Sequence, residues 1–164
     1  MAKAIVASSS PDATPDRRHD HEHQALTTAA VAIVLGFTAL PASANSVWLD
    51  QFGYRNQAGG SQTGVNNDIG IHQDGRRNAA IGNQHGRGNT IAIGQNGRRN
   101  TAQAHQTGRY NQGGVGQFGN NHNAVVIQDG NGNIAAGVQV GNGCSGNVAQ
   151  TGSGNVAAFV QTCY

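Results

Sequence analysis

The segment at residues 73–83, QDGRRNAAIGN, is the clearest copy of an eleven-residue phrase that fills most of the chain. Gln84 begins the phrase again, and glutamine returns at the same interval without a slip. The full series is Gln51, Gln62, Gln73, Gln84, Gln95, Gln106, Gln117, Gln128, Gln139, Gln150 and Gln161. A strict internal period indicates a repeat protein, in which each copy forms one structural unit and stacks on its neighbours.

Glycine and asparagine keep the phase of the glutamines. Each of the first ten glutamines is followed two residues later by a glycine, as Gly75 follows Gln73. Asparagine stands five residues after most of the glutamines, at Asn56, Asn67, Asn78, Asn89, Asn100, Asn111, Asn133 and Asn155. His122 and Cys144 replace the asparagine and Cys163 replaces the glycine, so the exceptions also fall on repeat positions.

The composition is unusual for a globular domain. Of 164 residues, 25 are glycine, while aromatic residues make up 5% and charged residues 11%. So few large apolar side chains cannot build a conventional core, and composition alone would suggest a disordered, low-complexity chain. The unbroken period argues against disorder, because a disordered segment has no need to hold a register.

The N-terminal part of the chain has the pattern of an export signal. Residues 27–40 form an apolar run, TTAAVAIVLGFTAL, which is followed by Pro41 and an A-x-A cleavage site ending at Ala44. We therefore predict a signal peptide with an extended n-region at residues 1–44 and a repeat domain at residues 45–164. A membrane anchor is the alternative interpretation. Export would place the chain where disulfides form.

The apolar pattern between the glutamines predicts β-strands. Before Gln73, alternate residues give one face made of Asn67, Ile69, Ile71 and Gln73. The next face carries Asn78, Ala80, Gly82 and Gln84, so large and small residues alternate from strand to strand. We expect an all-β fold, a β-solenoid of strand–turn–strand layers with 22 residues per layer and two facing parallel sheets. The eleven repeats predict five layers and one closing strand.

The turns are expected between glutamine and asparagine, at the x-G-x-x segment, where glycine would supply a positive φ. The inward glutamine and asparagine amides are expected to stack in ladders, because a buried amide is costly unless it is hydrogen-bonded. The alternative is that these glutamines and asparagines are solvated loop residues, but such residues would have no reason to recur every eleven positions. The candidate ladder residues are Asn45, Gln51, Asn56, Gln62, Gln73, Gln84, Gln95, Gln106, Gln117, Gln128, Gln139, Gln150, Asn155 and Gln161.

The phrase x-x-Q-x-G-x-x-N-x-A-x-x-x-x-Q resembles the curlin repeat of bacterial curli amyloid subunits, over residues 45–164. The resemblance implies a secreted subunit that polymerises into extracellular cross-β fibres at the bacterial cell surface, for adhesion and the biofilm matrix. It also implies a nucleator subunit and secretion machinery as partners. Whether this chain is the major or the minor (nucleator) subunit stays open. In the family the terminal repeats promote seeding, which points to Asn45, Gln51, Asn56, Asn155 and Gln161. One departure is that the repeat begins at Asn45, where curlins usually carry a targeting segment.

Arginine supplies all the positive charge of the repeat region, seven residues against four aspartates. Stacking should place these arginines in rows at the turns: Arg55, Arg76, Arg77, Arg87, Arg98, Arg99 and Arg109. Solubilising charge is one interpretation. A site for anionic polysaccharide or extracellular DNA is the other.

No pattern in the sequence indicates catalysis. His72, His85, His105 and His122 occupy different repeat positions and lack a metal-binding spacing. No nucleophile–base pair, phosphate loop or paired carboxylate recurs. We predict a non-enzyme with no cofactor, no metal and no small-molecule substrate. The alternative to a fibre subunit is a monomeric exported β-solenoid, a binding module for anionic polysaccharide or another surface ligand.

The two cysteines fall near each other in the predicted stack. Gln139 and Gln161 belong to adjacent layers of one sheet, and Cys144 and Cys163 flank the same turn edge. This could bring their Cα atoms within the range of a disulfide, and two unpaired thiols remain the alternative.

Overall fold

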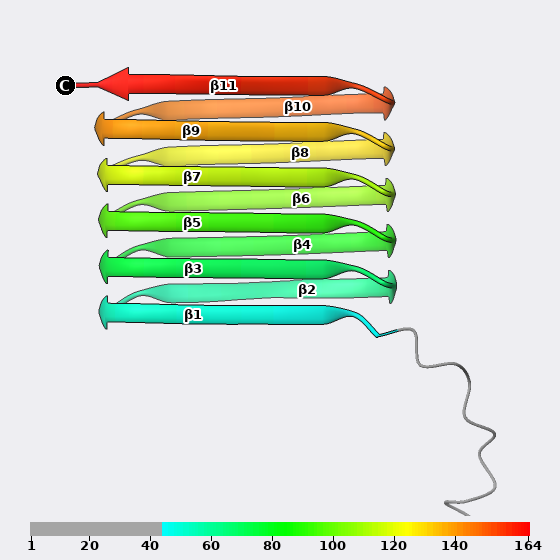
Figure 1. Cartoon of the computed structure of the whole chain (residues 1–164), viewed down its shortest axis with the longest axis horizontal. Coiled ribbons are helices and arrows are strands. Elements are labelled where there is room, and N and C mark those ends of the chain that lie inside the picture. Colours follow the sequence, from blue (N-terminus) through cyan, green and yellow to red (C-terminus); the bar gives the residue numbers. More distant parts are fainter. Residues whose placement is uncertain (1–43) are drawn as a thin grey trace, which may run out of the picture. The chain divides into compact units, whose positions relative to one another are not determined.

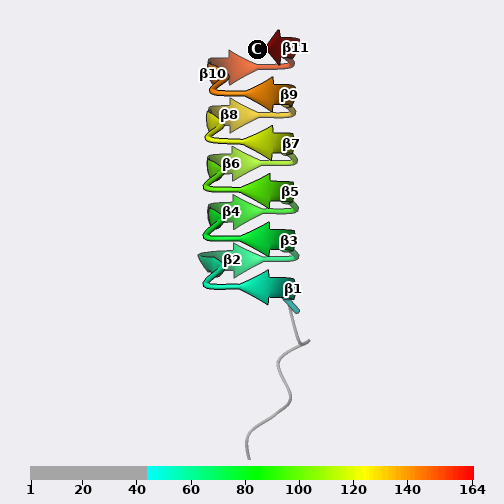
Figure 2. The same cartoon turned by 90° about the vertical axis from the view of Figure 1, so that its left-hand side faces the viewer.

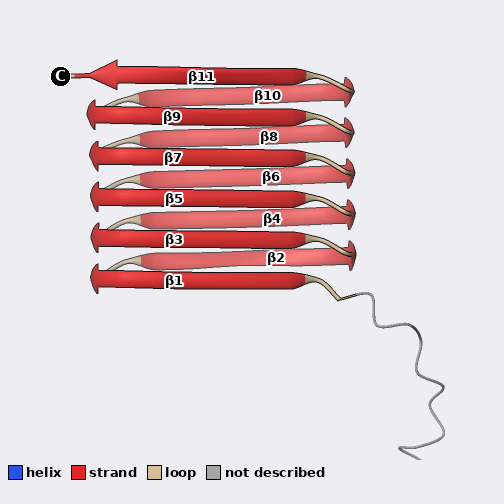
Figure 3. Ribbon diagram, viewed as in Figure 1, coloured by secondary structure: helices blue, strands red, loops and turns tan. Residues whose placement is uncertain are grey.

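The computed structural model describes residues 44–164. The predicted signal peptide lies outside the described residues except for Ala44. The described part contains eleven β-strands (Figures 1 and 3): β1 (Ser46–Tyr54), β2 (Gln57–Val65), β3 (Asp68–Arg76), β4 (Ala79–Arg87), β5 (Thr90–Arg98), β6 (Thr101–Arg109), β7 (Gln112–Asn120), β8 (Asn123–Asn131), β9 (Ile134–Asn142), β10 (Ser145–Ser153) and β11 (Val156–Cys163).

The strands form two parallel sheets that face each other. The odd strands make a six-stranded sheet in the order β1-β3-β5-β7-β9-β11, and the even strands make a five-stranded sheet in the order β10-β8-β6-β4-β2. Figure 2 shows odd and even strands alternating along the stack. The predicted fold class, a β-solenoid of two parallel sheets, is confirmed.

The register between layers is 22 residues. Gln73 of β3 pairs with Gln95 of β5, and the same offset relates Gln84 of β4 to Gln106 of β6. Each position of the repeat therefore stands directly above its equivalent in the next layer, so the glutamines form columns of identical residues.

The core is thin and follows the predicted strand phase. Ile69 and Ile71 are fully buried, while Asp68 on the same strand is exposed. A Cβ placed on Gly82 of the opposite sheet would lie 3.3 Å from Cγ2 of Ile69, so the glycine makes room for the isoleucine. The other core residues are Ala80, Ile91, Ile93, Ala102, Ala104, Val115, Ala124, Val126 and Ala135.

The position of the turn differs from the sequence-based expectation. β1 to β10 each have nine residues and run through both the glutamine and the glycine, so the x-G-x-x segment is mostly strand. The chain reverses at the residue just before the asparagine position, which has φ between 56° and 76° even where it is Arg77 or Tyr110.

The repeat glycines are needed for a second reason besides their positive φ. Their φ angles lie between 100° and 131°. A Cβ added at Gly97 would overlap the backbone carbonyl oxygen of Gly119 in the next layer. Any other residue there would hold the two layers apart.

We expect Gly97→Ala to lower the free energy of unfolding by more than about 1 kcal/mol, because the new methyl group meets backbone and the φ angle is unfavourable. Gly94→Ala on the same strand is the matched control, since a Cβ there has nothing within 4 Å. Chemical denaturation followed by far-UV circular dichroism measures both. Equal stability of the two variants would contradict the account of the glycine column.

Candidate functional site

The inward glutamines form two continuous ladders, one in each sheet. In every step, Nε2 of a glutamine donates to Oε1 of the glutamine 22 residues later, at 2.6–3.0 Å. Gln73, Gln95, Gln106, Gln117, Gln128 and Gln139 are almost completely buried. Because every bond points the same way, each ladder has a direction along the stack.

Each ladder glutamine also ties the two sheets together. Nε2 of Gln73 donates a second bond to the backbone carbonyl of Gln57, the first residue of β2 in the opposite sheet, at 2.9 Å. The same bond recurs for the glutamines from Gln62 to Gln161. One side chain therefore connects three strands, and no described buried side-chain amide lacks a partner.

The asparagine position works differently from the expected amide ladder. The backbone N–H of Asn67 donates to Oδ1 of Asn45 in the layer below, and its own Nδ2 donates to the carbonyl of Gly86. Direct amide–amide contact in this column occurs only from Asn89 to Asn67 and from Asn155 to Asn133 among the described residues. The shorter side chain reaches backbone rather than its equivalent, so asparagine caps the turns.

His122 takes over the asparagine role. The imidazole is buried, its Nδ1 accepts the backbone N–H of Cys144 at 3.1 Å, and its Nε2 lies 3.2 Å from the carbonyl oxygen of Phe118. These partners require a neutral ring with the proton on Nε2. The spacing of the histidines gave His122 no functional role, and its place in the asparagine series was the available signal.

Cys144 and Cys163 form a disulfide, with Cα atoms 5.5 Å apart. Cys144 lies at the turn between β9 and β10, and Cys163 is the last residue of β11. The bond therefore ties the terminal strand to the layer below it.

The turn edges carry the arginines in two rows. After the odd strands, Arg76 pairs in register with Arg98, and Arg77 and Arg99 follow them. These four residues line a polar groove of about 400 Å³ together with Tyr54, Asn120, Asn121 and Asn142. Arg55 lies on this edge over the ring of Tyr54, 4.8 Å from its centroid, while Arg87 and Arg109 pair on the opposite edge.

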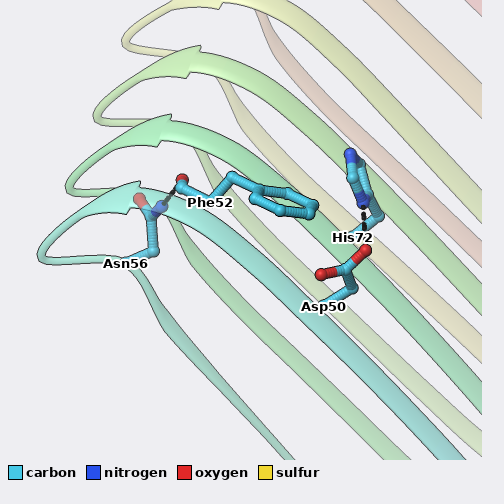
Figure 4. Close-up of polar contacts among 4 residues, drawn as sticks. All are labelled: Asp50, Phe52, Asn56 and His72. Carbon is cyan, nitrogen blue, oxygen red and sulfur yellow. Dashed lines mark hydrogen bonds and ion pairs between the residues drawn. The ribbon is translucent and has the colours of Figure 1, made fainter.

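A small polar and aromatic cluster joins β1 and β3 on their outer face. Figure 4 shows His72 beside Asp50, and Nδ1 of His72 lies 3.4 Å from Oδ2 of Asp50. The His72 ring also stacks on Trp48, with centroids 6.3 Å apart. At the following turn, Nδ2 of Asn56 donates to the carbonyl of Phe52 at 2.6 Å.

Both ends of the solenoid expose strand edges. At one end, the inward residues Val47 and Leu49 of β1 are 53% and 47% exposed, although the equivalent Ile69 and Ile71 of β3 are fully buried. At the other end, β10 and β11 are the last strands of their sheets within residues 44–164. Val156 and Val160 of β11 are more than 70% exposed.

The described residues contain no group of three or more histidine, cysteine, aspartate or glutamate side chains that could hold a metal ion. Likewise, no helix within residues 44–164 is long and apolar enough to cross a membrane.

These features define a parallel β-solenoid with side-chain amide ladders. The family model described as the curlin associated repeat matches residues 42–75, 64–97 and 97–130. The matches span more than half of the chain, and the chain belongs to the curlin-repeat family. No curated protein matches this sequence.

The ladders make a quantitative prediction. Gln106→Ala should lower the free energy of unfolding by about 2 kcal/mol or more, because it removes the partners of Gln84 and Gln128 and leaves the Thr90 carbonyl without its bond. Gln103→Ala on the same strand is the control, since Gln103 is exposed on the outer face and should change stability by less than about 0.5 kcal/mol. If urea denaturation gave the same loss for both, the ladders would not be stabilising the fold.

The disulfide makes a second prediction. Replacing both Cys144 and Cys163 by Ser should lower the free energy of unfolding by about 3 kcal/mol in the chain-entropy model. The loss should be local, seen as faster backbone amide exchange in β11 and unchanged exchange in β5. Hydrogen exchange with mass spectrometry measures both strands. Unaltered exchange in β11 would show that the bond does not hold the terminal strand.

Proposed function

We propose that this chain is a secreted structural subunit that polymerises end to end into extracellular curli-type fibres. The observation that carries the proposal is the exposure of Val47 and Leu49, whose equivalents in β3 are completely buried. A further layer stacked on β1 would bury both side chains and complete the backbone hydrogen bonds of the edge.

Neither end carries the usual protection against edge pairing. β1, β2, β10 and β11 contain no proline, and none of their inward positions carries a charge. The ladders support a head-to-tail fibre in which all copies point the same way, since Nε2 of Gln161 at one end matches the acceptor Oε1 of Gln51 or Gln62 at the other. Stacked identical amides are a source of stability in cross-β fibres.

The proposed location is the outside of the bacterial cell, with a role in adhesion and the biofilm matrix. This rests on membership of the curlin-repeat family and on the predicted signal peptide. A nucleating subunit and a secretion apparatus are the partners that export and assembly of such a subunit require. The function is structural rather than catalytic.

A monomeric binding module is the second candidate, favoured by the arginine-lined groove beside Arg76 and Arg98. An acidic polysaccharide or extracellular DNA would suit guanidinium groups spaced one layer apart. Thioflavin T fluorescence with electron microscopy separates the candidates. A fibre subunit gives seeded growth of fibres, whereas the binding module stays monomeric at the same concentration.

We expect the double change Asn155→Ala and Gln161→Ala to lengthen the lag before fibres form, because both side chains present hydrogen-bonding groups to an incoming layer. Asn147→Ala with Thr162→Ala is the matched control, as these residues lie on the outer faces of β10 and β11. Thioflavin T kinetics at equal concentration provide the measurement. An unchanged lag in the first variant would mean that the terminal amides do not control growth.

A further inference from the structure

The two end faces of the solenoid do not match when a copy is simply translated along the axis. Residues 44–164 form eleven strands, so β1 and β11 both lie in the six-stranded sheet, while β2 and β10 both lie in the five-stranded sheet. Odd and even strands alternate along the stack, which places each strand half a layer beyond the one before it (Figure 2).

Consider a next copy placed with β1 paired on β11. Its β2 would then stand two layer spacings beyond β10, so one strand-wide gap would open in the five-stranded sheet. The backbone groups of β10 and the amide of Gln150 would face this gap without partners. Unpaired polar groups of this kind are costly once they are shut away from water.

The gap closes when the next copy is turned by half a revolution about the long axis. β1 of the next copy then pairs with β10, and β2 of the next copy pairs with β11, so that its odd strands continue the five-stranded sheet. A half turn also reverses strand direction, which keeps both new pairs parallel. Every edge strand gains a neighbour at the spacing found inside the solenoid, except at Cys163, which stands in the repeat-glycine column without the positive φ of the glycines. The new pairing of β11 is therefore expected to end before Cys163.

Resting on the proposed fibre function, we infer that consecutive copies in the fibre are related by a half turn about the fibre axis, with the two sheets exchanged from copy to copy. The partner is thus a second copy of this chain in one defined orientation. Eleven half-layer steps give a rise of about 26 Å per copy, taking the usual spacing between strands.

The ladders continue through this junction. Among residues 44–164, Gln150 Nε2 donates only to the carbonyl of Ile134, and Gln161 Nε2 only to that of Ser145. Within that range each therefore lacks the forward bond of the glutamines before it. In the exchanged arrangement these two amides meet the Oε1 atoms of Gln51 and Gln62 of the next copy. Asn155 Oδ1 likewise meets the backbone N–H of Asn56, the bond that Asn133 makes to Asn155 within the chain.

Side-chain size favours the same arrangement. Phe159 points into the core at the end of the stack, and its ring occupies the space where a Cβ on Gly137 or Gly146 would lie. The exchanged junction places Gly60 of the next copy directly beyond Phe159. The ring then has a glycine on each neighbouring strand of its sheet, Gly137 on β9 and Gly60 on β2 of the next copy. The junction with β1 paired on β11 would instead place Leu49 beyond Phe159, so that two large side chains would compete for the same space.

The exchange changes the surface of the fibre. Arg76, Arg77, Arg98 and Arg99 all lie on the edge that follows the odd strands. A half turn between copies moves this edge to the opposite side of the fibre at each step. The basic grooves would therefore alternate between the two edges rather than form one continuous row.

Disulfide trapping in mixed fibres tests the inference. Three full-length single variants are prepared, Asp50→Cys, Ala149→Cys and Val160→Cys, each on an outward position. The native cysteines are both bonded, so each chain carries one added thiol among its described residues. Equimolar pairs are assembled, oxidised mildly and run on a non-reducing gel.

The exchanged junction places residue 50 of the next copy beside Ala149 of β10, so Asp50→Cys with Ala149→Cys gives covalent dimers. The pair Asp50→Cys with Val160→Cys then gives none above the single-variant background, because these positions lie on opposite outer faces. A second set, Ser46→Cys with Ser145→Cys against Ser46→Cys with Val156→Cys, repeats the comparison if a first variant fails to assemble.

Dimers through Val160→Cys or Val156→Cys would overturn the inference in favour of translated copies. Fibres that give neither kind of dimer would also overturn it, because their junction would then use other surfaces. These results leave the proposed function standing. Failure of the unmodified chain to form fibres at all would instead remove the proposed function, and the inference with it.

Discussion

The structure depends on the buried glutamine amide, which can satisfy both its donor and its acceptor only if an identical amide lies on each side of it. Gln95 shows the requirement: it accepts from Gln73, donates to Gln117 and also donates to the Ala79 carbonyl. Burial of such a group without these bonds would cost several kcal/mol in an apolar setting. A slip in register would break the bonds of a whole ladder at once.

The other repeat positions follow from that stacking. Layers held at one strand spacing leave no room for a Cβ on Gly97, which would overlap the backbone carbonyl oxygen of Gly119, so the position is glycine. The tight reversal leaves backbone groups that the asparagine side chain binds, as Asn67 does with Thr63 and Gly86. The apolar core can be small, because the hydrogen bonds of the glutamine and asparagine columns also stabilise the contact between layers.

Much of this could be predicted from the sequence, because a repeat of odd and even strands makes each residue's environment periodic. The alternation of Ile69, Ile71 and Gln73 was enough to predict the inward face and the two sheets. The length of the strands could not be predicted in the same way. Gly75 suggested a turn, but β3 continues through this glycine to Arg76. The bonding of Asn67 and the role of His122 depend on side-chain reach, which spacing alone does not encode.

The in-phase glutamine amides, rather than the apolar core alone, hold the layers in register. Side-chain amide hydrogen exchange, followed residue by residue by NMR on the assembled protein, tests this most directly. We expect strong protection of the amides in the two ladders from Gln73 to Gln139, and rapid exchange of the outward Gln57, Gln103 and Gln112. Equal exchange rates in the two groups would contradict it.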